Sequence, residues 1–245
     1  MAVIGRVSEL WRYPVSSLGG ERVAVLAVEA AGVPGERGYG VVALDDGKIA
    51  APGMDRRWEP LPGVKARSAE GRIELSTDGK RWVAVPSPEA DRALSDRLGF
   101  AAAVHPYADG PLPEGYDGPR AVNRYRPSAL HLVTTASLGR LKALHPAGDA
   151  DARRFRPNIL IEMPDAPGRF PETEWIGRAL TVGEARLTVE EPCRRCGFTI
   201  MAQDELERDA DVLRQLVRHN GHNMGVYCAV ARPGVLRVGD PVAFA

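Results

Sequence analysis

The sequence has little cysteine and no surplus of either charge. Its 3 cysteines among 245 residues are too few, and odd in number, for a disulfide framework, and they favour a reducing compartment. Lys plus Arg and Asp plus Glu both number 32, so the formal net charge is zero. Because a general binder of nucleic acid or of anionic membranes needs surplus cations, we expect neither as a partner.

Long apolar runs and dinucleotide-binding motifs are missing as well. No run of about 18 apolar residues could span a bilayer, and the N-terminal MAVIGRVSELWRYPV lacks the charged and apolar regions of a signal peptide. We therefore expect a cytoplasmic protein. No G-x-G-x-x-G follows a predicted strand, which argues against a dinucleotide site. The cysteines are also too few for a [2Fe–2S] cluster, which needs four ligands.

Short strands separated by turns dominate the first part of the chain. Hydrophobic residues make up 44%, and the 26 Gly and 20 Pro are spread along the chain, as in a globular protein with many turns. Segments such as AVIGRVSEL and RIELS recur at spacings of roughly 8–12 residues, which predicts a sandwich or barrel. YGVVALDDGKIAAP is predicted to be two strands joined at Asp46-Gly47. A helix is expected from Pro88, with Ser87 as its cap and Gly99 as its end.

A segment rich in Pro and Gly, residues 106–128, predicts a connection between two domains or a long surface loop. We place these domains at residues 1–110 and 111–245. In the second, ALHLV, RFRPNILIEM and the segments after Met224 are predicted strands, and RALTVGEARLTVEE is a predicted hairpin. TTASLGRLKALH and DELERDADVLRQLVRHN are predicted helices. The expected fold class is therefore α+β, mainly β with a few helices.

The segment EPCRRCGFTI places Cys193 and Cys196 three positions apart. Such a pair indicates zinc, a redox dithiol or two buried small hydrophobic side chains. A zinc site needs further ligands, for which Cys228, His219 and His222 are the available candidates. A thioredoxin-like dithiol normally begins a helix, whereas GFTIM is predicted to be a strand.

The neighbouring arginines favour a different chemistry. Arg194 and Arg195 stabilise a thiolate at whichever cysteine they approach. A thiolate is a soft metal ligand, and guanidinium groups bind phosphate bidentately. Together these groups indicate a metal carried on a phosphorylated organic cofactor.

Other polar residues stand at strand ends. Arg156 and Asn158 are two apart, so their side chains share one face of a predicted strand. Ser16 and Ser17 precede a glycine turn, and Arg37 begins a strand. Each also has an ordinary interpretation, as a solvated basic edge, a hairpin loop or a surface ion pair.

Taken together, these segments resemble a known family. WRYPVSSLGG and GVPGERGYGVV resemble the N-terminal β-barrel segment that precedes MOSC domains. RFRPNILIE, PCRRCGFTI and GVLRVGDPV resemble the MOSC domain itself. The branch most similar contains the mitochondrial amidoxime-reducing components and their bacterial relatives. The resemblance implies an N-terminal β-barrel-like domain followed by a MOSC β-barrel domain.

The resemblance also implies a site and a cofactor. The cofactor would be a molybdopterin-type molybdenum cofactor, independent of pyridoxal phosphate. Cys196 matches the molybdenum ligand, which would make it the catalytic residue. The cofactor-binding positions of the family match Ser17, Arg37, Ser128, Arg156, Asn158, Arg195 and Tyr227.

Three departures from the family pattern affect the expected substrate and cofactor pose. Ser16 stands where the family usually has lysine, and Glu36 replaces the usual aspartate. After Cys196 the family commonly reads T-T-V-D, whereas this chain has FTIMAQD. Asp204 matches that acid only with a shift.

The expected activity is reduction of an N-hydroxylated small molecule by molybdenum. Since the chain lacks its own electron-transfer motifs, electrons must come from a separate ferredoxin or flavodoxin-like protein with its reductase. Asp204, His219 and His222 are candidate general acids. Sulfur transfer through a Cys196 persulfide, cofactor carriage without catalysis, and a structural zinc protein are the alternatives.

Overall fold

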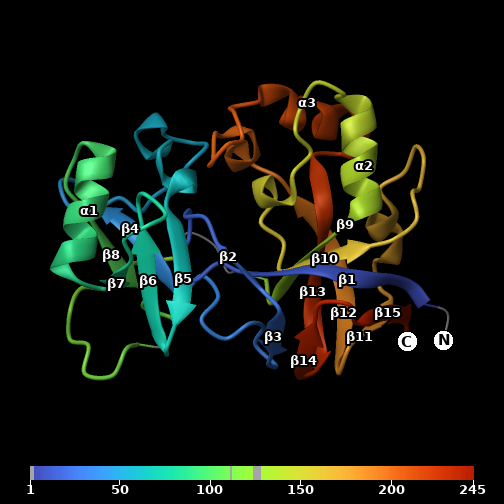
Figure 1. The fold of residues 1–245 in the computed structure, drawn as a ribbon, viewed down its shortest axis with the longest axis horizontal. Coiled ribbons are helices and arrows are strands. Elements are labelled where there is room, and N and C mark those ends of the chain that lie inside the picture. Colours follow the sequence, from blue (N-terminus) through green and yellow to red (C-terminus); the bar gives the residue numbers. More distant parts are fainter. Residues whose placement is uncertain (1–2, 111, 124–127) are drawn as a thin grey trace.

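The structure, a computed structural model, describes residues 3–110, 112–123 and 128–245. Figure 1 shows two regions side by side, one containing β4 to β8 and α1, the other a larger body of strands with α2 and α3 against it. The expectation of a mainly β fold with a few helices is confirmed. None of the helices in the described part of the chain has the length and apolar character needed to cross a membrane.

The larger region is built on a closed barrel. Within the described residues, its sheet has eight strands in the order β10-β9-β13-β12-β11-β15-β1-β2, and β1 also pairs with β10. That second pairing joins the two ends, so all strands except β2 form a closed ring. The strands are β1 (Val3–Arg12), β2 (Glu21–Val23), β9 (Leu130–Thr134), β10 (Ile159–Glu162), β11 (Ala179–Val182), β12 (Ala185–Arg194), β13 (Asn223–Arg232) and β15 (Pro241–Phe244).

The sequence alternation explains how the barrel fills its interior. Along β12, Ala185, Leu187 and Val189 are fully buried while the residues between them are more exposed, as the two-residue period of a strand requires. They join one apolar cluster with residues from both ends of the chain. The predicted hairpin of β11 and β12 turns at Gly183-Glu184 as expected.

The smaller region has its own apolar core around Trp58, Leu61 and Leu75. It contains β4 (Tyr39–Ala43), β5 (Lys65–Ala69), β6 (Arg72–Ser76), β7 (Val83–Val85), α1 (Pro88–Leu98) and β8 (Ala102–Pro106). Two 3-10 helices, η1 (Arg56–Trp58) and η2 (Leu61–Gly63), connect them. The caps of α1 are as predicted, because Ser87 accepts a hydrogen bond from the Ala90 amide and Gly99 is left-handed with φ of 78°.

The helices of the larger region cover one side of the barrel. α2 (Thr135–Leu144) is capped by the hydroxyl of Thr134, and α3 (Ala210–His219) is capped by the carboxylate of Asp209. Both pack with Phe155 and Met224 in a third apolar cluster. Three further 3-10 helices are η3 (Ala152–Arg154), η4 (Pro171–Trp175) and η5 (Gly197–Ile200).

Several element predictions were wrong. The residues after Cys196 form η5, not a strand. Residues 204–209 precede α3 instead of belonging to it, because Asp209 stops the helix by capping it. The second strand of the 39–52 hairpin is reduced to one bridge between Val42 and Ile49.

The two regions do not separate cleanly at residue 110. β1 and β2 belong to the barrel, and β3 (Val25–Val28) pairs with β14 (Gly234–Arg237) near the C-terminus. The chain therefore begins in the larger region, then forms the smaller region, and then returns to the larger region at β9.

Candidate functional site

A cavity of about 380 Å³ collects most of the predicted site residues. Such a volume lies within the range of about 300–1,000 Å³ typical of small-molecule sites. The lining comes from loops around β1 and β4, the loop at residues 49–54, strands β9 and β13, and the segments before β10 and after β12. The predicted residues that line it are Ser17, Arg37, Ser128, Arg156, Arg195, Cys196 and Tyr227.

Three cavity residues have an unusual backbone conformation. Ser17, Arg37 and Arg156 have φ of 70°, 47° and 54°, in the left-handed region that non-glycine residues rarely adopt. Such conformations cost about 1–3 kcal/mol each and gather at functional sites. Three of the six such residues in the described part of the chain line this one cavity, which makes it a candidate functional site independently of any motif.

Arg37 is fixed by the residue before it. The Glu36 carboxylate accepts hydrogen bonds from the Arg37 guanidinium and from the Tyr13 amide, the latter at 2.8 Å. Arg37 also donates to the Arg156 carbonyl at 3.3 Å. Glu36, one of the departures from the family pattern, is therefore used to hold this guanidinium in place.

Arg156 is buried between two aromatic rings. Its guanidinium lies 4.3 Å from the centre of the Tyr13 ring and 5.1 Å from that of Phe198, and it donates to the Leu18 carbonyl. Cation–π contacts of this kind orient a guanidinium. Arg156 thus places a fixed positive charge at the cavity wall.

Cys196 is the exposed cysteine of the pair and faces the cavity. The next residue, Gly197, touches Gly53 so closely that a Cβ added to Gly53 would lie 2.5 Å from the Gly197 carbonyl carbon. This contact between glycines sets the loop at residues 49–54 directly against the segment that carries Cys196.

Cys193 is fully buried, and it receives the guanidinium of Arg195. Arg195 Nη1 donates to Cys193 Sγ at 2.7 Å, and Nη2 donates to the Phe155 carbonyl at 2.9 Å. Burial alone would raise the pKa of the Cys193 thiol, but the charges of Arg195 and His131 and hydrogen bonds from His131 and Tyr227 lower it to about 6. The arginine expected beside the proposed ligand is thus turned towards the other cysteine.

Asn158 is the one predicted binding residue outside the cavity lining. Its side-chain carbonyl accepts from the His131 amide at 3.0 Å, and its side-chain nitrogen donates to the Trp11 carbonyl at 3.3 Å. Both partners are backbone groups of barrel strands. The Asn158 side chain therefore bridges β1 and β9 where the barrel closes. The prediction that Arg156 and Asn158 share one face of a strand was wrong, because Arg156 lies before β10 begins.

The candidate general acids also lie outside the lining. Asp204 pairs with Lys65 at 3.3 Å and with Arg153 at 3.6 Å. The buried Arg154 donates to carbonyls of residues 149, 199, 201 and 207. These contacts hold the loop after η5 in position.

His222, another candidate general acid, has a structural contact through its backbone. Its carbonyl accepts a hydrogen bond from the Arg195 amide at 2.8 Å.

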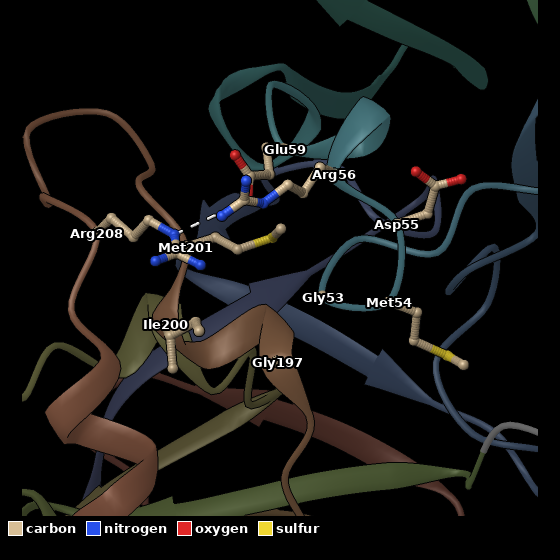
Figure 2. Close-up of a pocket in the computed structure, with 9 residues that line it drawn as sticks. All are labelled: Gly53, Met54, Asp55, Arg56, Glu59, Gly197, Ile200, Met201 and Arg208. Carbon is tan, nitrogen blue, oxygen red and sulfur yellow. Dashed lines mark ion pairs between the residues drawn. The ribbon is translucent and has the colours of Figure 1, made fainter.

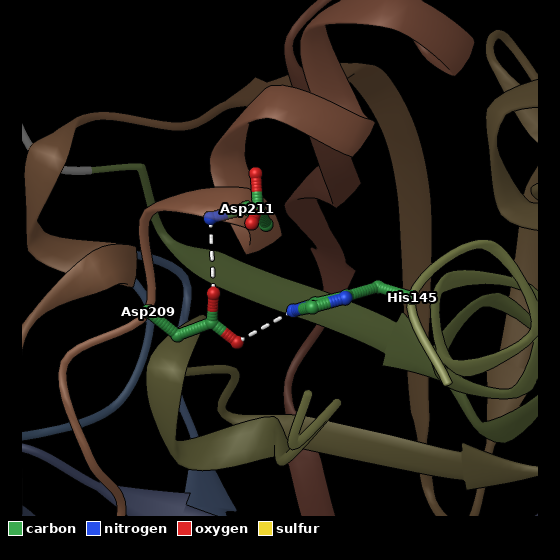
Figure 3. A group of neighbouring side chains, drawn as sticks. All are labelled: His145, Asp209 and Asp211. Carbon is green, nitrogen blue, oxygen red and sulfur yellow. Dashed lines mark hydrogen bonds and ion pairs between the residues drawn. The ribbon is translucent and has the colours of Figure 1, made fainter. Parts of the chain in front are cut away.

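The zinc alternative finds no support in the arrangement of ligands. In the ranges that the structure describes, the one cluster of three potential metal ligands is His145, Asp209 and Asp211, without any cysteine. His145 Nε2 and Asp209 Oδ2 lie 2.8 Å apart in a hydrogen bond (Figure 3), and Asp211 has a carboxylate oxygen within 4.8 Å of both. Asp209 also caps α3, so this group ties the end of α2 to the start of α3. Cys228 is buried in the barrel, and burial raises the pKa of its thiol to about 12.

Several residues that line the cavity were not identified from the sequence. His131, Phe155, Phe198, Tyr107 and the loop from Ile49 to Met54 line the cavity. A histidine inside the apolar strand ALHLV was the one available signal. A second cavity of about 200 Å³ is lined by both Gly53 and Gly197, and at its wall Arg208 approaches Glu59 at 3.9 Å (Figure 2).

Comparison with known proteins places the chain in a family. The MOSC domain model matches residues 119–243, and the MOSC N-terminal beta barrel domain model matches residues 4–103. A molybdenum cofactor sulfurase from Anopheles gambiae is 35% identical over 88 residues, which are 35% of this chain and 11% of that protein. The chain therefore matches about a tenth of its curated relative.

Solved structures give weaker likenesses. The YuaD protein from Bacillus subtilis has a TM-score of 0.49 and 12% identity, covering 97% of this chain and 93% of its own. YiiM from Geobacillus stearothermophilus has a TM-score of 0.35 and 18% identity, covering 48% and 54%. The assignment rests on the two family models, of which the first spans about half the chain and the second most of the remainder. The chain belongs to the MOSC domain family and carries the N-terminal β-barrel domain of that family before its MOSC domain.

Proposed function

We propose that this protein acts with a molybdenum cofactor, and that it is a molybdenum-dependent reductase of N-hydroxylated small molecules with Cys196 as the metal ligand. The observation that carries the proposal is the composition of the cavity. One exposed thiol shares about 380 Å³ with several guanidinium groups and hydroxyls. The family and the name of the matched relative support a role connected with molybdenum cofactor.

The donor set fits such a cofactor. Molybdenum takes a soft sulfur ligand, and Cys196 supplies an accessible one. A phosphorylated pterin needs convergent donors for its phosphate, and Arg37, Arg156, Arg194 and Arg195 line the same cavity. Ile49 and Ala51, which line the cavity and are partly exposed, offer apolar surface for a flat heterocycle. Ser16, which replaces the usual lysine, keeps a hydroxyl at the wall.

Each residue has a definable task in this proposal. The bound cofactor would supply the two-electron oxygen-removal chemistry. Cys196 would anchor the metal, and the fixed guanidiniums of Arg37 and Arg156 would hold the phosphate end. The loop at residues 49–54 would limit the access of water and shape the substrate side.

Electrons must reach the site from outside the chain. We propose a ferredoxin or flavodoxin-like donor with its own reductase, because the sequence offers no motif for a dinucleotide and too few cysteines for an iron–sulfur cluster. A cytoplasmic location, with a small molecule as substrate and neither nucleic acid nor membrane as partner, belongs to the same proposal.

Sulfur transfer through a Cys196 persulfide is the second candidate. The observation that favours it is the exposed thiol at the cavity mouth together with the similarity to a sulfurase segment. This reaction needs the same cysteine but no resident metal. A carrier of the cofactor without catalysis would use the same cavity.

Metal analysis tests the proposal. We expect about one molybdenum per chain after expression in a host that makes the cofactor. Cys196→Ser should lower this content at least about tenfold, the lower bound known for disturbed metal shells. Cys228→Ala, which removes a thiol buried in the barrel, should retain it. Full molybdenum content in Cys196→Ser would refute the assignment of the ligand.

Two further assays separate the remaining candidates. Turnover of an amidoxime with a chemically reduced dye distinguishes the reductase from a carrier. Sulfane sulfur on Cys196 in metal-free protein, lost in Cys196→Ser, would instead favour sulfur transfer.

A further inference from the structure

The buried sulfur of Cys193 lies behind the cavity wall and is surrounded by residues of that wall. Arg195, His131 and Tyr227 all line the cavity, and all three interact with Cys193. The strand register explains why these residues lie close to Cys193. Tyr227 of β13 lies opposite His131 of β9 and opposite Glu191 of β12, two residues before Cys193.

Arg195 depends on Cys193 for its orientation. One terminal nitrogen of its guanidinium donates to Cys193 Sγ at 2.7 Å and the other to the Phe155 carbonyl at 2.9 Å. The Arg195 backbone amide is held by the His222 carbonyl at 2.8 Å. Two hydrogen bonds thus fix the side chain and a third fixes the backbone, and the sulfur accepts one of the two side-chain bonds.

Arg195 also needs a counter-charge. Its Nε is fully buried and has no hydrogen-bond partner among the described residues. No carboxylate in the described ranges forms a salt bridge with it. The residue as a whole is partly exposed, but its Nη1 contacts Cys193 Sγ, the side-chain acceptor next to it that can become an anion. A thiolate at Cys193 would therefore pair the guanidinium charge where it is buried.

We propose that Cys193 is a positioning residue: its thiolate is the fixed counter-ion of Arg195, and it sets the cavity wall that faces Cys196. The two cysteines of the C-x-x-C segment then have different tasks, one accessible at the cavity and one enclosed behind it. The effect on the cofactor rests on the proposed function, whereas the charge of Cys193 does not.

The surroundings of the sulfur agree with a buried anion. Arg195 contributes positive charge, His131 contributes charge and a hydrogen bond, and Tyr227 contributes a hydrogen bond. These overcome burial and bring the pKa of Cys193 to about 6. Burial and the neighbouring sulfur charge raise the pKa of Tyr227, so its hydroxyl stays protonated and able to donate.

A titration of Cys193 in the full chain tests the ion pair. In Cys196→Ser, Cys193 and Cys228 are the remaining thiols, and the pKa of Cys228 near 12 keeps it silent around neutral pH. Ultraviolet thiolate absorbance should therefore report Cys193, with a midpoint about 6. Adding Arg195→Gln should raise the midpoint by about 1–3 pH units. Arg194→Gln, which removes the adjacent guanidinium, should leave it in place.

A midpoint near that of an ordinary thiol, about 8.5, would overturn the proposal. A titration midpoint of Cys193 that does not change in Arg195→Gln would also overturn the proposal. Neither result depends on whether the protein binds molybdenum, so the titration tests the ion pair independently of the proposed function.

The positioning role is tested by changing the charge of Cys193. Cys193→Asp keeps a small anion, whereas Cys193→Ser keeps the size and loses the charge. We expect molybdenum per chain to fall several-fold in the serine variant and to be restored towards the parent by aspartate. Equal contents in both variants and the parent would overturn the role. If the parent holds no molybdenum, the proposed function fails and the cofactor role of Cys193 fails with it, while the titration still decides the ion pair.

Discussion

At the scale of single residues, burial and partners decide which groups carry charge. Glu172 is fully buried, and its Oε2 accepts from the hydroxyls of Thr134 and Ser137. Its other oxygen has no hydrogen-bond partner among the described residues. Burial raises the pKa of this carboxyl, and the hydroxyl hydrogen bonds only partly oppose the effect.

Glu172 therefore makes the protein less stable at neutral pH than a neutral isostere would. Above the pKa of the unfolded state, about 4.3, the unfolded chain releases the proton while the folded state resists doing so. Stability accordingly falls as pH rises from that value towards the raised folded pKa. We expect Glu172→Gln to increase the free energy of unfolding at neutral pH by ~1 kcal/mol, a typical size for a single substitution. The gain should vanish near pH 4 in urea titrations, and a gain that is the same at both pH values would contradict this account.

Most of the candidate site could be predicted residue by residue, but its internal contacts could not. The cavity gathers Cys196 with Ser17, Arg37, Arg156 and Tyr227. The sequence shows that Arg195 stands between two cysteines, and only the turn after β12 decides that it faces Cys193. His131 could not be placed because its neighbours across the sheet lie almost a hundred residues away along the chain, beyond the reach of local patterns.

At the scale of elements, the contact between Gly53 and Gly197 joins the loop at residues 49–54 to the start of η5. Any Cβ at Gly53 would meet the Gly197 backbone, and one at Gly197 would lie 2.6 Å from the Gly53 carbonyl oxygen. Because neither partner is a flexible side-chain end, the backbone itself would have to move.

We expect Gly53→Ala to destabilise the protein by about 1–3 kcal/mol and to lower molybdenum content by displacing the Cys196 segment. Gly71→Ala is the matched control. Gly71 has a similar positive φ, 77° against 86°, but nothing within 4 Å of an added Cβ. Urea unfolding and metal analysis of both variants separate the steric contact from backbone strain. Equal losses in the two variants would show that the contact is unimportant.

Element predictions succeeded where local chemistry decides and failed where it does not. Ser87 and Gly99 determine α1 by capping, and the hairpin predicted for RALTVGEARLTVEE forms from β11 and β12. The segment GFTI is apolar and was predicted as a strand, but beyond Arg194 it has no pairing partner and coils into η5. Strand propensity alone does not decide the structure, because a strand also needs a neighbouring strand to pair with.

At the scale of the whole molecule, sequence position and spatial region differ. The resemblance predicted two successive domains, and the two family models match successive spans. The barrel nevertheless takes β1 from the beginning of the chain, with Leu10 opposite Ile159 and Val3 opposite Ala243. No local pattern in residues 3–12 could reveal which distant strands they join.

A fragment of residues 111–245 should therefore not fold alone. It lacks β1, so β10 and β15 would be left as open edges. Joining residues 1–28 to residues 106–245 through a flexible Gly/Ser linker should restore a cooperative urea transition, since it returns β1, β2 and β3 to their partners. Cooperative unfolding of the shorter fragment would contradict the role given to β1.

That closure by the first strand also bears on synthesis. Val3–Arg12 is synthesised more than two hundred residues before Pro241–Phe244, one of its partners in the closed barrel. At ~5–20 residues per second the wait is on the order of ten to fifty seconds. Throughout that interval the edge of β1 that pairs with β15 lacks its partner, so nascent-chain chaperones are expected to bind this edge before the barrel closes.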